Sequence, residues 1–221
     1  MGELARYFDG EFLEAEVGGR LAELSVIEVA GWRRDMPYAA TGLPWVMPSP
    51  NMPTPDTALV YPGTGMFEGT SLSEGRGTTR PFELVGAPFV DYRWAEALAG
   101  LDLPGVGFRE AYFNPTFSKH QGKVCGGVQV HITDPRTFDP MRVGVEMLVA
   151  ARALYADFQW RYDSYDPKRP YWIDKLTGST RLREQVTAGA SADEVVGAWR
   201  DELAAFDDRR QQYLLYSGPV A

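Results

Sequence analysis

Residues 68–83 read Glu-Gly-Thr-Ser-Leu-Ser-Glu-Gly-Arg-Gly-Thr-Thr-Arg-Pro-Phe-Glu, and the interpretation of the chain starts from this stretch. Carboxylates, guanidiniums and small hydroxyls lie among glycines in this stretch. The pattern is typical neither of an amphipathic helix nor of an alternating strand. Glycine lets the backbone turn with positive φ or approach a ligand closely. Arginine fits a carboxylate with two parallel hydrogen bonds. The stretch predicts a loop that binds a polar, anionic ligand, and the alternative is a solvated turn with surface ion pairs.

The overall composition excludes several classes of protein. The chain has 221 residues, of which 44% are hydrophobic and 24% charged, as in a globular protein. Its net charge of -8 argues against binding to nucleic acid, which requires a basic face. No apolar run reaches the ~20 residues of a membrane span. The N-terminus has no signal-peptide pattern and opens directly into a helix-like sequence, so we expect further residues upstream, and the compartment stays open.

The cysteine and histidine residues predict no metal site and no cofactor. Cys125 is the single cysteine, which excludes an intrachain disulfide, and its strand-like surroundings favour a buried structural thiol over a nucleophile. His131 falls on the same expected strand, whereas His120 falls in a turn and is expected to be exposed. Two histidines on separate elements, without carboxylates at matching spacing, make a weak metal site.

The hydrophobic pattern predicts a mixture of helices and strands, and therefore an α/β or mixed α+β fold. The expected helices span 2–14, 87–101, 139–158 and 179–188, and a last helix starts at the capping box of Ser191. The expected strands span 21–29, 57–61, 107–117 and 123–133, and a further strand begins at Glu83. Residues 36–56 are rich in proline and in large apolar side chains, which predicts an ordered, functional loop.

Distinctive motifs occur along the whole chain, at residues 41–45, 48–53, 61–64, 73–79 with 81–83, 86–88, 174–179 and 213–216. Together they resemble the NamZ-type exo-β-N-acetylmuramidases. The core Ser-Glu-Gly-Arg-Gly-Thr-Thr-x-Pro-Phe-Glu at 73–83 is long and is the most specific part of the resemblance. One departure is Ser71, where the family usually has asparagine; the change removes an amide and weakens any hydrogen-bond role at that position.

The resemblance implies a glycoside hydrolase that releases N-acetylmuramic acid from the non-reducing end of peptidoglycan fragments, muropeptides or disaccharides. It implies two lobes, the first Rossmann-like and the second a smaller mixed-sheet lobe with C-terminal helices, and an active site between them. Residues 1–65 would be the end of the first lobe and residues 66–221 the second. The family's proposed catalytic glutamate belongs to an earlier Pro-Glu-His-Gly-like segment, a pattern that this sequence does not contain. The resemblance thus implies a first lobe as partner, in cis or in trans.

Glycoside hydrolysis generally requires two carboxyl groups beside the scissile bond, one as acid and one as base or nucleophile. Glu74 and Glu68 are the candidate catalytic residues of the glycine-rich stretch. The alternative for Glu74 is an ion pair with Arg76 or Arg80 that stiffens the loop. For Glu83, structural pairing is the favoured interpretation.

Arg76 is the main candidate for substrate binding. N-Acetylmuramic acid carries a lactyl carboxylate, and a guanidinium between two glycines could bind it, helped by Ser73 or Thr78. The alternative is that Arg76 is an internal strut for Glu74.

Three further residues are candidates for contact with the sugar: Trp45 and Asn51 in the Pro-rich loop, and Asn114 before Pro115. Aromatic rings pack on sugar faces, although ordinary packing between lobes explains Trp45 equally. A second aromatic cluster is interpreted as core or as a lobe contact; its members are Trp160, Tyr162, Tyr165, Tyr171 and Trp172. The alternative function is a non-catalytic carbohydrate-binding or subunit-interface module, in which exposed apolar surface would favour a homodimer.

Overall fold

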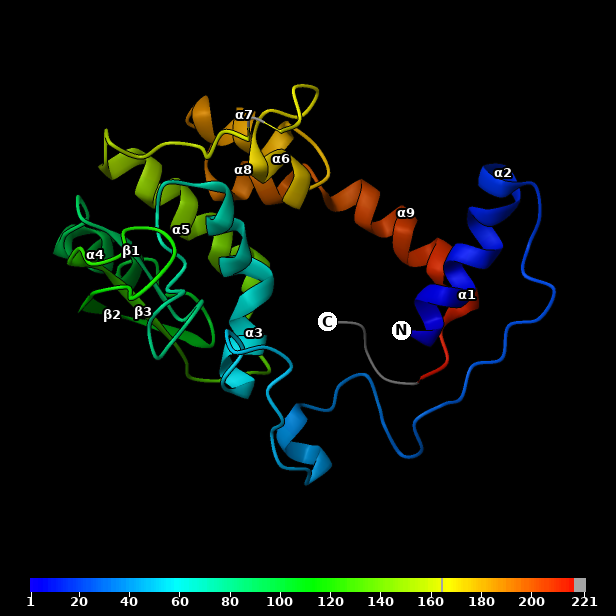
Figure 1. Cartoon of the computed structure of the whole chain (residues 1–221). Coiled ribbons are helices and arrows are strands. Elements are labelled where there is room, and N and C mark those ends of the chain that lie inside the picture. Colours follow the sequence, from blue (N-terminus) through cyan, green and yellow to red (C-terminus); the bar gives the residue numbers. More distant parts are fainter. Residues whose placement is uncertain (164, 217–221) are drawn as a thin grey trace. The chain divides into compact units, whose positions relative to one another are not determined.

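The computed structural model describes residues 1–163 and 165–216 (Figure 1). The chain forms two compact units. One combines Met1–Leu43 with Trp199–Ala221, and the other is Pro44–Ala198. The second unit contains the sheet and the glycine-rich stretch.

The first unit consists of helices and irregular segments. Its elements are α1 (Gly2–Glu11), α2 (Leu13–Val17), η1 (Tyr38–Thr41), α9 (Arg200–Arg210) and η3 (Gln211–Tyr213). The helix expected at 2–14 is confirmed, with a turn at Phe12 that separates α1 from α2. Tyr7 makes edge-on ring contacts with Phe206 of α9 and Tyr213 of η3, so both ends of the chain contribute to this unit.

The strand expected at 21–29 is wrong, because this segment pairs with no strand among the described residues. Richness in Val, Ile and Leu favours a strand, but a strand forms only where its backbone groups pair with a neighbour. Instead, Asp9 accepts a hydrogen bond from the Leu21 amide at 2.8 Å, and the Tyr216 hydroxyl accepts one from the Val29 amide at 3.0 Å. The segment is therefore fixed at its two ends and remains irregular between them.

The second unit is built on a three-stranded antiparallel sheet in the order β1-β3-β2. Its strands are β1 (Leu84–Ala87), β2 (Val106–Phe113) and β3 (Cys125–Ile132). The strands expected at 107–117 and 123–133 are confirmed in shorter form, and β1 begins directly after Glu83, as the sequence indicates. The β2–β3 connection, residues 114–124, lies at one end of this hairpin.

The helix next to this sheet is α4 (Tyr92–Ala99), and the other helices of the unit follow it in successive contacts (Figure 1). The helix α4 contacts β2, β3 and α5 (Pro140–Leu154), and α5 in turn contacts α3 (Pro55–Thr64), α7 (Arg181–Thr187) and α8 (Ala192–Gly197). The short helix α6 (Trp172–Leu176) contacts η2 (Gly65–Gly69). Both α4 and α5 start at an aspartate cap, Asp91 and Asp139, and the start of α5 at Asp139–Pro140 is the one that the sequence predicts. The result is a mixed α+β arrangement, as expected from the sequence.

Three other expectations need correction. Residues 57–61 lie in α3 and not in a strand, because the Thr54 side chain accepts the Thr57 amide at 3.2 Å and Pro55 opens the helix. The helix expected at 87–101 is shorter, because Ala87 ends β1, a turn follows, and the Asp91 cap starts the helix at Tyr92. The last helix is divided into α8 and α9 by a turn at 198–199, although its predicted capping box at Ser191 is confirmed.

The core of the second unit is formed by large side chains that have almost no exposed surface. They include Phe67, Leu72, Phe82, Trp94, Leu98, Met147, Leu148 and Ile173. Two of them, Leu72 and Phe82, belong to the glycine-rich stretch, so this loop is anchored in the core at both of its ends. Across the part of the chain that the structure describes, no helix combines the length and apolar character that crossing a bilayer requires.

Candidate functional site

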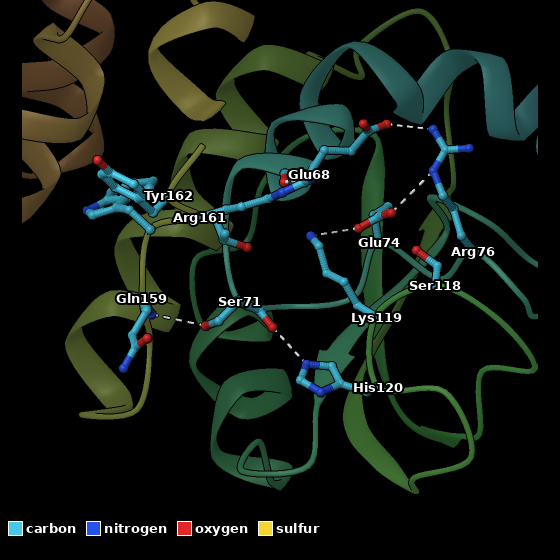
Figure 2. A pocket seen from close by; sticks show the side chains of 12 residues that line it. Glu68, Ser71, Glu74, Arg76, Ser118, Lys119, His120, Gln159, Arg161 and Tyr162 are labelled. Atoms are coloured by element: carbon cyan, nitrogen blue, oxygen red, sulfur yellow. Dashed lines mark hydrogen bonds and ion pairs between the residues drawn. The ribbon is translucent and has the colours of Figure 1, made fainter. Parts of the chain in front are cut away.

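A cavity of about 780 Å³ lies in the second unit, where three chain segments meet (Figure 2). Its walls come from the glycine-rich stretch, from the β2–β3 connection and from the segment that follows α5. Its lining residues include Glu68, Ser71, Glu74, Arg76, Lys119, His120, Gln159, Trp160, Arg161 and Tyr162. A volume in this range is typical of small-molecule sites.

The glycine-rich loop has the backbone that its sequence predicts. Gly75 has φ of 77° and Gly77 has φ of 83°, a left-handed conformation that residues with a Cβ rarely adopt. The Gly77 carbonyl accepts hydrogen bonds from the amide and the hydroxyl of Thr116, both at 2.9 Å. Arg76 is therefore held between two fixed turns, next to the β2–β3 connection.

Ser73 and Thr78 support this loop from within. Ser73 exchanges backbone hydrogen bonds with Gly86 of β1, at 2.7 and 3.0 Å, and its hydroxyl accepts the Gly75 amide at 3.1 Å. The Thr78 hydroxyl donates to the Gly75 carbonyl at 2.6 Å. Neither residue is among those that line the cavity, so their predicted contacts with a sugar stay predictions.

Arg76 connects the two candidate carboxylates. Its Nη2 donates to Oε1 of Glu68 at 2.6 Å, and its Nε lies 3.2 Å from Oε1 of Glu74. The guanidinium also stacks on the buried Phe82 ring, 4.9 Å from the ring centre. The ion pair with Glu74 matches the alternative interpretation of Arg76 as an internal strut, and a role of Arg76 in binding the sugar carboxylate stays a prediction.

Glu74 is the buried centre of this charge cluster, with only 3% of its side chain exposed. Its second oxygen, Oε2, lies 2.9 Å from Nζ of Lys119, although the angle is not that of a hydrogen bond. Two cations thus balance one buried carboxylate, and unpaired burial of that charge would be costly. Glu68 is more accessible, with 20% of its side chain exposed.

Lys119 is a buried ammonium held by three oxygen atoms. Besides its ion pair with Glu74, it donates hydrogen bonds to the backbone carbonyls of Phe67 at 2.7 Å and Leu72 at 2.8 Å. Burial lowers the pKa of Lys119, and the charge of Glu74 partly offsets this effect. Its neighbours Ser118 and His120 both have positive φ, 70° and 57°, a strained conformation that places Lys119 in the cavity wall.

The opposite wall is joined to the glycine-rich stretch by Ser71. Its hydroxyl accepts the Gln159 amide at 3.0 Å, and its carbonyl lies 2.7 Å from Nε2 of His120 (Figure 2). His120 is half-buried by this contact, so the expected exposed turn is only partly correct. Beyond Gln159, the backbone of Arg161 pairs with Gly69 and brings the Arg161 side chain to the cavity.

The cavity carries an excess of positive charge. Three cations, Arg76, Lys119 and Arg161, face two carboxylates, Glu68 and Glu74, although the whole chain has a net charge of -8. In a partly desolvated site such an excess favours a ligand with negative charge. The arrangement therefore suits an anionic polar molecule, with an accessible carboxyl group beside it.

The remaining candidates lie elsewhere. Trp45, Asn51 and Asn114 are not among the described residues that line the cavity, and their predicted sugar contacts stay predictions. The Trp45 ring donates to the Met52 carbonyl at 3.1 Å, which is a contact inside the Pro-rich loop. Glu83 is buried and accepts hydrogen bonds from Thr54, Thr57 and Arg80, at 3.1, 2.6 and 3.2 Å, which confirms structural pairing.

The surroundings of Cys125 are those of a structural thiol. Cys125 is fully buried, and burial raises its pKa to about 11. Among residues 1–163 and 165–216, no group of three metal-ligating side chains lies close enough together to hold an ion.

Sequence reasoning missed the residues that complete the cavity. The sequence predicts a turn for Lys119 and His120, and core or lobe packing for Trp160 and Tyr162. Tyr162 is in fact 62% exposed, and both aromatic side chains line the cavity. The available signal was the run Gln-Trp-Arg-Tyr at 159–162, where two aromatic rings flank an arginine just after a helix.

Comparisons with known proteins give consistent matches over the whole chain. The family model described as the C-terminal part of the exo-β-N-acetylmuramidase NamZ matches residues 59–216, and the one for the N-terminal part matches residues 1–56. The peptidoglycan β-N-acetylmuramidase NamZ of Bacillus subtilis is 42% identical over 218 residues, which is 98% of this chain and 50% of the relative.

Two solved structures of DUF1343 family proteins from Bacteroides fragilis have the same fold. The match to the first has a TM-score of 0.81 at 31% identity. It covers 98% of this chain and 56% of the Bacteroides protein. The match to the second has a TM-score of 0.71 at 25% identity. It covers 99% of this chain and 55% of that Bacteroides protein. The chain thus spans about half the length of the relatives that it matches.

Proposed function

Because this chain belongs to the exo-β-N-acetylmuramidase NamZ family, we propose that it supplies the substrate-recognition lobe of a peptidoglycan glycosidase. The reaction is release of N-acetylmuramic acid from the non-reducing end of a muropeptide or disaccharide. The observation that carries the proposal is the positively charged cavity, in which an anionic sugar would lie beside Glu68 and over Lys119 and Arg161.

The two carboxylates take different roles in this proposal. Glu68 is the carboxyl group that this lobe presents to the sugar, because it is the more exposed of the two. Glu74 is a positioning residue: its charge holds Arg76 and Lys119 in place. Arg76 then fixes the orientation of Glu68 through the 2.6 Å contact. A positioned acid or base of this kind typically contributes about 10²–10⁴-fold in rate.

We further propose that residues 1–65 are the end of a Rossmann-like first lobe and that residues 66–221 form the second. The junction of the two family matches, between residues 56 and 59, supports a division in this region. A first lobe, in cis or in trans, would cover the cavity and provide the second carboxyl group of a glycosidase.

A hydrolysis assay with a chromogenic N-acetylmuramide tests this function. The chain is assayed alone and after mixing with the remaining half of the Bacillus subtilis relative. We expect turnover of the muramide in the mixture, in preference to the matching N-acetylglucosaminide. Glu68→Gln should reduce that turnover by roughly 10²-fold or more, whereas Glu96→Gln, on the exposed side of α4, should not.

The other outcomes are also informative. Binding of N-acetylmuramic acid without turnover in either arrangement would favour the non-catalytic carbohydrate-binding module. If the chain neither binds N-acetylmuramic acid nor takes part in turnover of the muramide, the proposed function is refuted.

A further inference from the structure

We propose that Arg161 is the specificity-determining residue of the cavity and that it binds the lactyl carboxylate of N-acetylmuramic acid. This inference rests on the proposed function and names the side chain that recognises the charged part of the sugar. It differs from the expectation for Arg76, because the two guanidiniums have different contacts.

The cations that face the cavity are not equally free to bind a ligand. Arg76 already uses Nη2 and Nε on Glu68 and Glu74. The Lys119 ammonium is surrounded by two carbonyl oxygens and a carboxylate. An added carboxylate would have to displace one of these internal contacts at either residue, and breaking a buried charge pair is costly.

Arg161 has no carboxylate within ion-pair distance among the described residues. Its one side-chain hydrogen bond runs from Nη1 to the Glu68 carbonyl and is long, at 3.5 Å. The guanidinium stacks on the Trp172 ring, 4.8 Å from the ring centre, which leaves the in-plane N–H groups available. A carboxylate could therefore bind here without removing an existing ion pair.

The base of the Arg161 side chain is fixed on both sides. Its amide donates to the Gly69 carbonyl at 2.8 Å, and its own carbonyl accepts the Trp172 amide at 3.0 Å. Stacking on Trp172 then restricts the far end of the side chain. Because the residue is held before a ligand arrives, less conformational entropy is lost on binding.

The position of Arg161 also suits recognition of a sugar substituent. Figure 2 shows the side chain extending from the segment after α5 toward the backbone of Glu68, whose carboxylate is directed to Arg76. Trp160 and Tyr162, its neighbours in the chain, line the same cavity. A sugar ring placed beside these aromatic side chains would direct a charged substituent toward Arg161. N-Acetylglucosamine lacks this substituent and would leave the guanidinium without a partner.

The test is calorimetric titration of the full chain with three probes: N-acetylmuramic acid, its lactyl methyl ester and N-acetylglucosamine. The ester keeps the shape of the substituent and removes its charge. A charge-assisted hydrogen bond to an arginine predicts that the unaltered chain binds the acid on the order of 10- to 100-fold more tightly than the ester. In Arg161→Gln the acid and the ester should bind with nearly equal affinity, and the affinity for the ester should be almost unchanged.

Two variants control the experiment. Arg161→Lys keeps the charge and should restore part of the ratio, whereas Arg109→Gln, an exposed arginine on β2, should leave the full ratio. Unfolding midpoints of all variants show whether the fold is intact.

The results separate the two claims. If the unaltered chain binds none of the probes, the proposed function fails and the inference fails with it. If the chain binds the sugars and Arg161→Gln keeps the full acid-to-ester ratio, the proposed function stands and the assignment of Arg161 is wrong. A loss of the ratio in Arg76→Lys but not in Arg161→Gln would assign the carboxylate to Arg76 instead.

Discussion

Replacing Lys119 with methionine tests whether the cavity depends on a balanced pair of buried charges. The substitution keeps most of the apolar stem and removes an ammonium that contacts Glu74 and two carbonyl oxygens. Glu74, with 3% of its side chain exposed, would keep only its contact with Arg76. Breaking a buried pair costs about 3–5 kcal/mol, and the remaining cation reduces this figure. We therefore expect a loss of about 2–4 kcal/mol in unfolding free energy, or about 5–15 °C in melting temperature.

A double-mutant cycle in urea unfolding measures the coupling of this pair. Glu74→Gln alone leaves Lys119 as a buried cation with only carbonyl oxygens as partners, so it should also destabilise the chain. The double variant removes both charges and should cost about 1–3 kcal/mol less than the sum of the single changes. Lys123→Met, at an exposed position of the same connection, is the matched control and should change stability by less than about 0.5 kcal/mol.

The pH dependence gives a second readout of the same residue. Burial lowers the pKa of Lys119 below the 10.5 of a free lysine, so the unfolded chain binds this proton more tightly. The stability difference between the natural chain and Lys119→Met should therefore increase as the pH rises toward 10.5. An additive double-mutant cycle, or a difference that falls with rising pH, would refute this description of the charge cluster.

The other predictions concern the loop, the thiol and a helix cap. Gly77→Ala should destabilise the chain by more than about 2 kcal/mol, because the backbone there has φ of 83° and a Cβ would lie 2.6 Å from the Phe117 amide nitrogen. Gly178→Ala has similar strain, with φ of 74°, but open space around the Cβ, and should cost only about 1 kcal/mol in the same urea titration. Cys125 has a pKa of about 11 and is buried, so iodoacetamide should leave it unmodified at pH 8 in the folded chain and modify it in urea, as mass spectrometry would show. Ser191→Ala removes the capping box of α8 and should lower the unfolding free energy by about 1 kcal/mol, whereas an unchanged value would mean that the cap is not formed in solution.

Local signals predicted those parts of the fold that depend on neighbouring residues. Alternation of apolar side chains at 123–133 indicates β3, and the Asp139–Pro140 start indicates α5. The same local reasoning failed at 57–61, where a run of apolar residues suggested a strand. The cap at Thr54 and the proline after it were the stronger signal, and they start a helix instead. At 21–29 the composition favours a strand, but a strand also needs a partner that no local pattern can supply.

The site was predictable only in the part that lies within one stretch of sequence. Glu68, Glu74 and Arg76 are close in the chain, and the glycines beside Arg76 indicated their loop directly. Lys119 and Arg161 are distant from this loop in sequence and reach it through a hairpin connection and through the segment after α5. Which arginine is already paired depends on three-dimensional contacts, so composition alone pointed to Arg76 and gave no reason to consider Arg161.

A crystal structure of the chain with N-acetylmuramic acid tests the central claim most directly. The account predicts electron density for the sugar in the cavity between the glycine-rich loop and residues 159–162, with its carboxylate at the Arg161 guanidinium and its ring near Glu68. Density for the sugar at another surface, with this cavity empty at saturating ligand, would contradict the account.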